Sequence, residues 1–237
     1  MRIVAWNCGG GFHRKLRFVA DLQPDVAIIA ECCKPDRLDE LGFGTSAWVG
    51  RLHYKGLAVF GFGEWSVAER PLDEHLEWVL PVDVSGPADL LLVAVCAANH
   101  RAKSHPERFR GMRQPAVIPE VIDIGGHKQR VVVAGDFNDN PVFDKTHRPG
   151  FAATSSRLEQ VGLTSLYHHA TGEAFGDEAT PTLWWRDRAE DRPRFHIDYA
   201  WVSQPLLAGA RLAVTDYATS VTQAGSDHAA LIVDLDL

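Results

Sequence analysis

The chain has 237 residues, of which 46% are hydrophobic, and a formal net charge of −7. This composition predicts one compact domain over residues 1–237, and the negative charge excludes a protein whose whole surface grips nucleic acid. The longest apolar run, residues 90–98, is shorter than the roughly 20 residues of a membrane-spanning helix, so we expect no membrane span.

Short apolar runs bounded by turn residues recur along the chain, a pattern typical of β-strands. In chain order, the predicted strands cover residues 2–6, 26–30, 56–62, 66–69, 76–82, 90–96, 130–134, 197–202, 211–215 and 229–235. Helices are predicted over residues 13–22, 108–124 and 155–161, with Ser155 or Ser156 capping the last and Gly162 ending it. Many strands and few helices predict an α/β fold, a two-sheet β-sandwich flanked by helices in four layers, α/β/β/α.

The cysteines show neither a CxxC pair nor the spacing of a zinc site. They are Cys8, Cys32, Cys33 and Cys96. Four cysteines without a pattern in a chain of this length predict buried free thiols and a cytoplasmic location.

Polar side chains follow four of the predicted strands. Asn7, Glu31 and Asp136 each end an apolar run, and the run over residues 90–96 leads into Asn99 and His100. Ligands gather at one set of strand ends in open sheets, so we expect these side chains to share one edge of the sandwich. Asn138 follows Asp136 by two residues, so the two side chains point the same way if the chain stays extended there.

Two further signals stand before strands instead of after them. Asp227 and His228 precede the last predicted strand, and an antiparallel strand begins where its partner ends, so they are expected at the same edge. His196 and Asp198 are two residues apart at the start of a strand, which predicts one shared face. Each of these residues alone is more typical of a turn, a solvated strand end or a surface position than of a catalytic site. The set becomes informative because it occurs together and in this order.

The ordered motifs resemble those of the endonuclease/exonuclease/phosphatase superfamily, whose fold is DNase I-like. The matching stretches are WN at residues 6–7, AE at 30–31, GDFN at 135–138, TPTLWWR at 180–186, HIDY at 196–199 and SDH at 226–228. The resemblance covers nearly the whole chain. It implies a two-sheet sandwich with the site at one edge, and metal-dependent hydrolysis of phosphoesters by direct attack of water.

The resemblance also assigns roles to individual residues. Glu31 would be the main metal ligand, with Asn7 beside it and Asp227 completing the shell. Asp136 would orient or deprotonate the attacking water, and Asn138 would hold water or a phosphate oxygen. His228 would contact the scissile phosphate while Asp198 fixes its ring; whether Asp136 or His228 is the general base stays open.

The chemistry explains why such a site needs a cation. Glu31, Asp136, Asp198 and Asp227 would bring four carboxylates into one pocket, and each like-charged pair about 4 Å apart costs roughly 4 kcal/mol at an effective dielectric constant of 20. A divalent cation removes this conflict and polarises the phosphate. Since the candidate ligands are oxygen donors, we expect Mg²⁺ or Mn²⁺.

The sequence departs from the family's pattern in two places. Cys96 stands where the family usually has a histidine or tyrosine that touches the phosphate, and a buried, space-filling thiol is the favoured interpretation. Asn99 fits the next phosphate-contacting position, and His100 is a candidate substitute for the missing histidine. Cys8 and Gly9 follow the WN motif where some nucleases carry an acidic residue, which favours one metal ion over two.

Basic and aromatic residues near the motifs indicate a substrate-binding rim. Arg101 leads one basic cluster, Arg186 leads another, and Trp184 or Trp185 is available to stack on a base. The substrate-binding candidates are Asn99, His100, Arg101, Trp184, Arg186 and His196. The segments Lys55–Gly56 and His168–His169 are weaker candidates to approach the pocket.

Three functions remain open. The leading prediction is a Mg²⁺-dependent nuclease or phosphodiesterase acting on DNA or RNA. The second is a phosphatase or diesterase for a small or lipid phosphate, and the third is a catalytically silent binding protein on the same scaffold. The retained acidic and histidine motifs argue against the third. The sequence predicts nothing about the oligomeric state.

Overall fold

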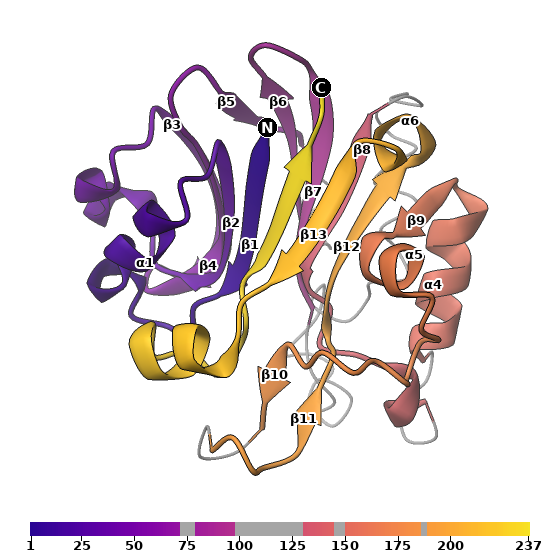
Figure 1. Cartoon of the computed structure of the whole chain (residues 1–237). Coiled ribbons are helices and arrows are strands. Elements are labelled where there is room, and N and C mark those ends of the chain that lie inside the picture. The colour runs from indigo at the N-terminus through magenta and orange to yellow at the C-terminus, as the bar shows by residue number, and fades with distance from the viewer. Residues whose placement is uncertain (72–78, 98–129, 145–149, 186–188) are drawn as a thin grey trace.

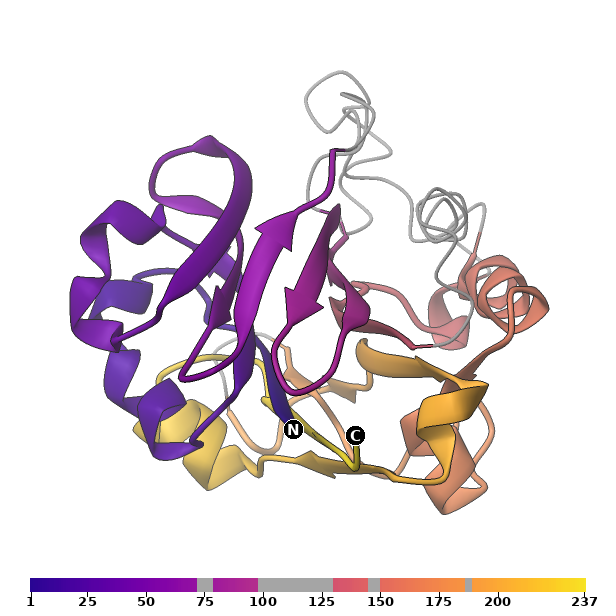
Figure 2. The same ribbon diagram turned by 90° about the horizontal axis from the view of Figure 1, so that it is seen from above.

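The structure, a computed structural model, describes residues 1–71, 79–97, 130–144, 150–185 and 189–237. Its strands form two six-stranded sheets and a separate two-stranded hairpin. The two sheets face each other with helices on both outer sides, as Figure 1 and the view from above in Figure 2 show. The predicted two-sheet sandwich flanked by helices is therefore confirmed.

The first sheet has the order β13-β14-β1-β2-β4-β3, and its only parallel pair among the described strands is β1 with β2. Its strands are β1 (Arg2–Asn7), β2 (Val26–Cys32), β3 (Thr45–Leu52), β4 (Lys55–Gly61), β13 (Ala210–Val214) and β14 (Leu231–Leu235). The second sheet has the order β5-β6-β7-β8-β12-β9. Its strands are β5 (Ser66–Glu69), β6 (Val79–Ser85), β7 (Leu90–Cys96), β8 (Val131–Asp136), β9 (Leu163–Ser165) and β12 (Asp198–Ser203).

The helices are short and lie outside the sheets. The α-helices are α1 (Leu16–Asp21), α4 (Phe151–Gln160), α5 (Leu166–Thr171) and α6 (Gln204–Leu207). The other helical turns are η1 (Phe12–Arg14), η2 (Pro35–Arg37), η3 (Asp39–Leu41), η5 (Pro141–Phe143) and η6 (Ala218–Gln223). Among the described helices, none has the length and apolarity needed to cross a membrane.

Three apolar clusters correspond to the spaces between these layers. The largest lies between the sheets and takes Ile28 and Leu231 from the first sheet and Leu92 and Val132 from the second. A second packs α4 against the outer face of the second sheet, and a third packs α1 against the outer face of the first. Burying each large aliphatic side chain contributes about 1.5–3 kcal/mol, so this layered core holds the sheet edges in fixed positions.

All ten predicted strands overlap observed strands, and those over residues 66–69 and 90–96 have the predicted bounds. Residues 76–78 of the strand predicted over 76–82 lie outside the described residues. The prediction missed β3 and β9, and also the hairpin formed by β10 (Leu183–Trp184) and β11 (Arg194–Phe195). The predicted helix over residues 108–124 lies outside the described residues.

The cap predicted for the helix over residues 155–161 is wrong. The helix begins at Phe151, because the carboxylate of Asp144 accepts hydrogen bonds from the backbone N–H groups of Phe151 and Ala152, at 2.7 and 3.1 Å. Gly162 follows the helix with a φ of 84°, as its predicted role at the helix end requires.

One edge of the sandwich collects the ends of several strands. The two chain termini lie together at the opposite edge, and the hairpin β10–β11 extends from the edge where β1 ends and β12 begins (Figure 1). Asn7 is the last residue of β1, Asp136 the last of β8 and Asp198 the first of β12. The register places Asp198 opposite Asp136 and Asn7 opposite Ala30.

Gly135 explains how β8 approaches its neighbour just before Asp136. Its φ is 137°, and a Cβ atom at this position would lie 2.1 Å from the carbonyl oxygen of Val95 in β7. No side chain fits there, so glycine is required at this position.

Candidate active site

Asp136, Asp198 and His228, which we call the acid–histidine cluster, lie at this edge. One side-chain ligand atom from each residue comes within 4.8 Å of the others. His228 Nδ1 is 2.9 Å from Asp198 Oδ2, and His228 Nε2 is 4.0 Å from Asp136 Oδ2. The three residues are only 1, 2 and 6% exposed, respectively, so the cluster is buried in spite of its charge.

Burial and mutual charge set the protonation of this cluster. Burial raises the pKa of Asp136 to about 7, the nearby His228 opposes this rise, and the charge of Asp198 adds to it. For His228, burial lowers the pKa, but the charges of Asp198 and Asp136 outweigh burial and raise it to about 10. His228 is therefore an imidazolium at neutral pH, held between two carboxylates.

Two amide side chains orient Asp136. Asn7 donates a hydrogen bond from Nδ2 to Asp136 Oδ2 at 2.9 Å, and Asn138 donates from Nδ2 to the same oxygen at 2.8 Å. The backbone N–H of Asn138 donates to Asp136 Oδ1 at 2.8 Å. The chain does not stay extended here, because Asn138 has a φ of 50° and the chain turns. The turn nevertheless brings the two side chains together.

The cluster is held from behind by residues to which no role is assigned from the sequence. Ser226 Oγ donates to the carbonyl of Asn7 at 2.6 Å and accepts from the backbone N–H of His228 at 3.1 Å. Trp6 Nε1 donates to the carbonyl of His228 at 3.1 Å. Thr182 Oγ1 accepts from the backbone N–H of Asp198 at 3.0 Å. All three residues belong to the quoted motifs, but nothing in the sequence indicates that they support the cluster.

Glu31 occupies a strained position beside Asn7. It lies at an irregularity between Ala30 and Cys32 in the pairing of β2 with β4, and its φ is 58°. This left-handed conformation costs a non-glycine residue about 1–3 kcal/mol, which the surrounding structure must offset. Its carboxylate forms an ion pair with Lys55, with Oε1 and Nζ 2.9 Å apart. Lys55, a weaker candidate in the sequence, therefore does approach the site.

Cys96 lies between the acid–histidine cluster and the Glu31–Lys55 ion pair. It lies opposite Asp136 in the register of β7 with β8, and it is 4% exposed. Burial raises the pKa of its thiol well above the usual value; the charges of Asp136 and Glu31 raise it further, and Lys55 lowers it. Charges from both sheets thus act on one buried thiol, which places Glu31 and Lys55 at the same edge as the acid–histidine cluster.

Asp227 is half-buried, and its carbonyl accepts a hydrogen bond from the backbone N–H of Trp184 at 2.9 Å. Its charge contributes to the raised pKa of His228, so its carboxylate lies on the histidine side of the site. Asp227 is therefore close to the cluster without belonging to it.

The donor atoms fit a divalent cation that prefers oxygen ligands. The side chain of Glu31 is 27% exposed, and Asn7 Oδ1, which accepts the N–H of Gly9 at 3.0 Å, keeps a second lone pair. The acid–histidine cluster is a poorer site, because a protonated imidazole has no lone pair to offer. The partly exposed Glu31 and the buried Asn7 beside it are therefore the better candidates, with Asp227 as a further carboxylate.

The structure does not bring His196 and Asp198 onto one face. His196 Nδ1 is 2.7 Å from the carbonyl of Thr180, and its ring packs against Tyr167 and Tyr199. Asp198 instead contacts His228. The prediction failed because β12 begins only at Asp198, so the two-residue alternation does not extend back to His196.

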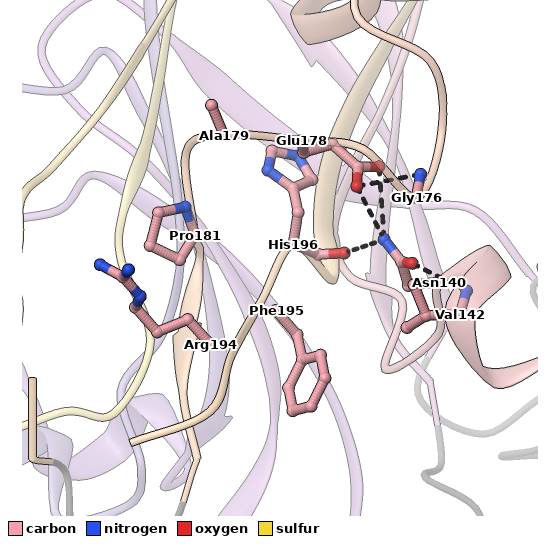
Figure 3. Close-up of a pocket in the computed structure, with 9 residues that line it drawn as sticks. All are labelled: Asn140, Val142, Gly176, Glu178, Ala179, Pro181, Arg194, Phe195 and His196. Carbon is pink, nitrogen blue, oxygen red and sulfur yellow. Dashed lines mark hydrogen bonds between the residues drawn. The ribbon is translucent and has the colours of Figure 1, made fainter. Parts of the chain in front are cut away.

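His196 lines a pocket of about 240 Å³, shown in Figure 3. Arg194 and Phe195 form one wall. On the other side Glu178 accepts hydrogen bonds from Asn140 Nδ2, at 3.1 Å, and from the N–H of Gly176, at 3.0 Å. His168 Nε2 lies 3.2 Å from the same carboxylate.

The remaining substrate-binding candidates have different outcomes. Trp184 is 3% exposed and packs edge-on against Tyr217, so the expectation that it stacks on a base is contradicted by its burial. Its neighbour Trp185 is half-buried. Asn99, His100, Arg101 and Arg186 lie outside the described residues.

Comparisons with known proteins agree with this fold. The model of the Endonuclease/Exonuclease/phosphatase family matches residues 4–228. No curated protein matches the sequence.

Several solved structures are similar. A 3′-5′ exonuclease, NExo, from Neisseria meningitidis has a TM-score of 0.74 and 21% identity, over 100% of both chains. A structure of the 3′ phosphatase NExo from Neisseria bound to product DNA hairpin has a TM-score of 0.73 and 21% identity, over 100% of both chains. Truncated TDP2 from Caenorhabditis elegans has a TM-score of 0.68 and 14% identity, over 100% of this chain and 97% of that one. At these identities the likeness shows the fold.

Proposed function

The chain belongs to the endonuclease/exonuclease/phosphatase family, and from that premise we propose that it is a divalent-metal-dependent phosphodiesterase that cleaves DNA or RNA by direct attack of water. The observation that carries the proposal is the buried acid–histidine cluster next to Asn7 and Glu31. A protein that only binds a ligand gains nothing from burying these charges together, because burial is costly to a carboxylate and is the main cause that raises the pKa of Asp136 to about 7.

Each residue of the cluster has a distinct proposed role. Asp136, oriented by Asn7 and Asn138, accepts the proton of the attacking water or holds that water in line. His228, protonated and fixed by Asp198, donates a charged hydrogen bond to the phosphate as negative charge develops on it. Asn138 is proposed to contact a phosphate oxygen through the same turn.

Glu31 and Asn7 are proposed to hold a Mg²⁺ or Mn²⁺ ion, with Asp227 near enough to contribute. Such an ion supplies charge neutralisation and polarises the phosphate. The oxygen donors of this set suit these hard cations better than zinc. A cytoplasmic location remains part of the proposal, in keeping with four cysteines that are free thiols.

Nucleic acid is the leading substrate class, and a small phosphoester is the second. The structurally similar NExo is bound to a DNA hairpin product, which supports the first. The pocket of about 240 Å³ favours the second, because it is smaller than the roughly 300–1,000 Å³ of typical ligand pockets and holds one small group. Arg194 and Phe195 in its wall suit an anionic or planar group of either substrate.

The test is a panel of substrates with Mg²⁺ or with EDTA: bis-p-nitrophenyl phosphate, plasmid, single-stranded DNA, RNA and inositol phosphates. Cleavage of nucleic acid that falls steeply with added salt supports the leading proposal. Turnover of small phosphates alone supports the second.

The panel is run with Asp136→Ala and with Asp236→Ala as a matched control. Asp236 makes an exposed ion pair with Arg211. The substitution Asp236→Ala therefore removes the same chemical group, a carboxylate, far from the cluster. If the wild-type protein turns over none of the substrates and Asp136→Ala is indistinguishable from it, the proposal is overturned in favour of a silent binding protein.

A further inference from the structure

The ion pair between Glu31 and Lys55 lies where the proposed cation binds. Lys55 is the first residue of β4, and Gly56 beside it pairs with Cys32, across the irregularity that contains Glu31. The two side chains are 27 and 42% exposed, so both are open to solvent and to ions. The ammonium group of Lys55 therefore pairs with a carboxylate oxygen of Glu31, the residue proposed as the main metal ligand.

Trp48 holds both partners in place. Its Nε1 donates a hydrogen bond, 3.3 Å long, to the carbonyl of Cys32, the residue that follows Glu31 in the chain. Its ring also covers Gly50 and Gly56, where an added Cβ atom would lie 2.7 and 2.5 Å from the ring. The strained Glu31 and the start of β4 are thus positioned by one side chain. An ordinary exposed ion pair, which contributes little to stability, does not need a strained backbone.

We propose that Lys55 and the divalent cation compete for Glu31, and that Lys55 turns to a phosphate oxygen of the substrate when the cation displaces it. This inference rests on the proposed function. A cation bound at Glu31 repels the ammonium group 2.9 Å from the same carboxylate. The released ammonium remains next to the acid–histidine cluster, since its charge already acts on Cys96 opposite Asp136. An anionic phosphoester bound at the cluster then offers it a partner of opposite charge.

A bracing role for Lys55 predicts a different change in cation affinity from a competing role. If Lys55 were only a brace that orients the Glu31 carboxylate, its removal would weaken cation binding. If it competes with the cation, its removal strengthens cation binding. The sign of the change therefore separates the two.

The first experiment measures Mg²⁺ and Mn²⁺ affinity of the metal-free full chain by calorimetry, without substrate. We expect Lys55→Met to bind about fivefold more tightly than wild type, the size expected when an exposed ion pair no longer has to be broken. Lys34→Met is the matched control. Lys34 Nζ lies 5.5 Å from the centre of the Trp48 ring, so this substitution removes the same charge nearby from a residue that does not pair with Glu31. The control should stay within about twofold of wild type.

The second experiment measures steady-state kinetics on the phosphodiester that the panel identifies. Lys55→Met should raise KM about tenfold with little change in kcat, and Lys55→Arg should restore KM because it keeps the charge. Thermal melts of each variant check that the fold is retained.

The outcomes separate this inference from the proposed function. Unchanged or weaker cation binding in Lys55→Met, with binding lost in Glu31→Gln, overturns the competition and leaves the proposed site intact. Normal cation binding in Glu31→Gln overturns the ligand assignment itself. An unchanged KM in Lys55→Met overturns the transfer of Lys55 to the substrate.

Discussion

The acid–histidine cluster and the Glu31–Lys55 pair lie at the same edge of the sandwich but are built in opposite ways. The cluster is buried, and its orientation is fixed by hydrogen bonds from Asn7 and Asn138. The pair is partly exposed and depends on a strained backbone.

The difference shows how one edge serves two tasks. Groups proposed to act on water and phosphate need a fixed aim and a shifted pKa, and both follow from burial. A group proposed to take up an ion from solvent must stay accessible and must have a partner that can leave. Burial would fix the orientation of Glu31, but it would also close Glu31 off from ions in solvent.

The largest expected effect is that of Asp136→Ala on the chemical step. Loss of a positioned proton acceptor lowers rates about 10²–10⁴-fold, so we expect kcat to fall about a thousandfold. Calorimetry should find Mg²⁺ affinity within about threefold of wild type, because the cation is assigned to the exposed side. Loss of both properties together would contradict the separation of the two regions.

The next effect is that of Asp198→Asn on His228. The charge of Asp198 helps to raise the pKa of His228, so its removal should lower that pKa from about 10 and leave the ring neutral at a lower pH. We expect kcat to fall about a hundredfold. An NMR titration of the His228 ring checks the cause, and an unchanged titration would contradict it.

A smaller effect is expected on stability as a function of pH in EDTA. Both Asp136 and His228 have folded-state pKa values above their usual 3.8 and 6.5. Their stabilising contributions are therefore present at low pH and are lost as the pH rises through about 7 for Asp136 and about 10 for His228. We expect Tm to fall by about 2–4 °C or more between pH 6 and pH 9, and to fall less with Mg²⁺.

Asp136→Ala supplies the control for these melts. Its Tm should change less than that of wild type around pH 7, since the titrating carboxyl is gone. Parallel curves for the two proteins would show that other groups cause the drop.

The smallest effect is expected for Cys96→Ala. The thiol is buried between the sheets, and burial raises its pKa, so it is uncharged and unsuited to bind phosphate. Activity should stay within about threefold, with a stability loss of about 1 kcal/mol in a urea melt. A loss of activity comparable to that of Asp136→Ala would make Cys96 part of the site.

The sequence predicts best what depends on neighbouring residues. β7 was predicted with its observed bounds, because every residue of Leu90–Cys96 is apolar and buried. The polar ends of β1 and β8 were also readable, since Asn7 and Asp136 directly follow apolar runs.

What the sequence missed depends on contacts between distant residues. Asp144 moves the start of α4 through a hydrogen bond across seven positions, and no local pattern signals it. The buried state of Trp184 depends on Tyr217 from a later segment. The turn at Glu31 has no glycine or proline to mark it, although its strain sets the direction of the side chain.

The hydrogen bond from Trp6 to His228 joins residues 222 positions apart, and β14 next to His228 pairs directly with β1. During synthesis on the ribosome, Asn7, Glu31 and Asp136 emerge long before His228 does. The proposed site is therefore complete only once His228 has been synthesised and β14 has paired with β1.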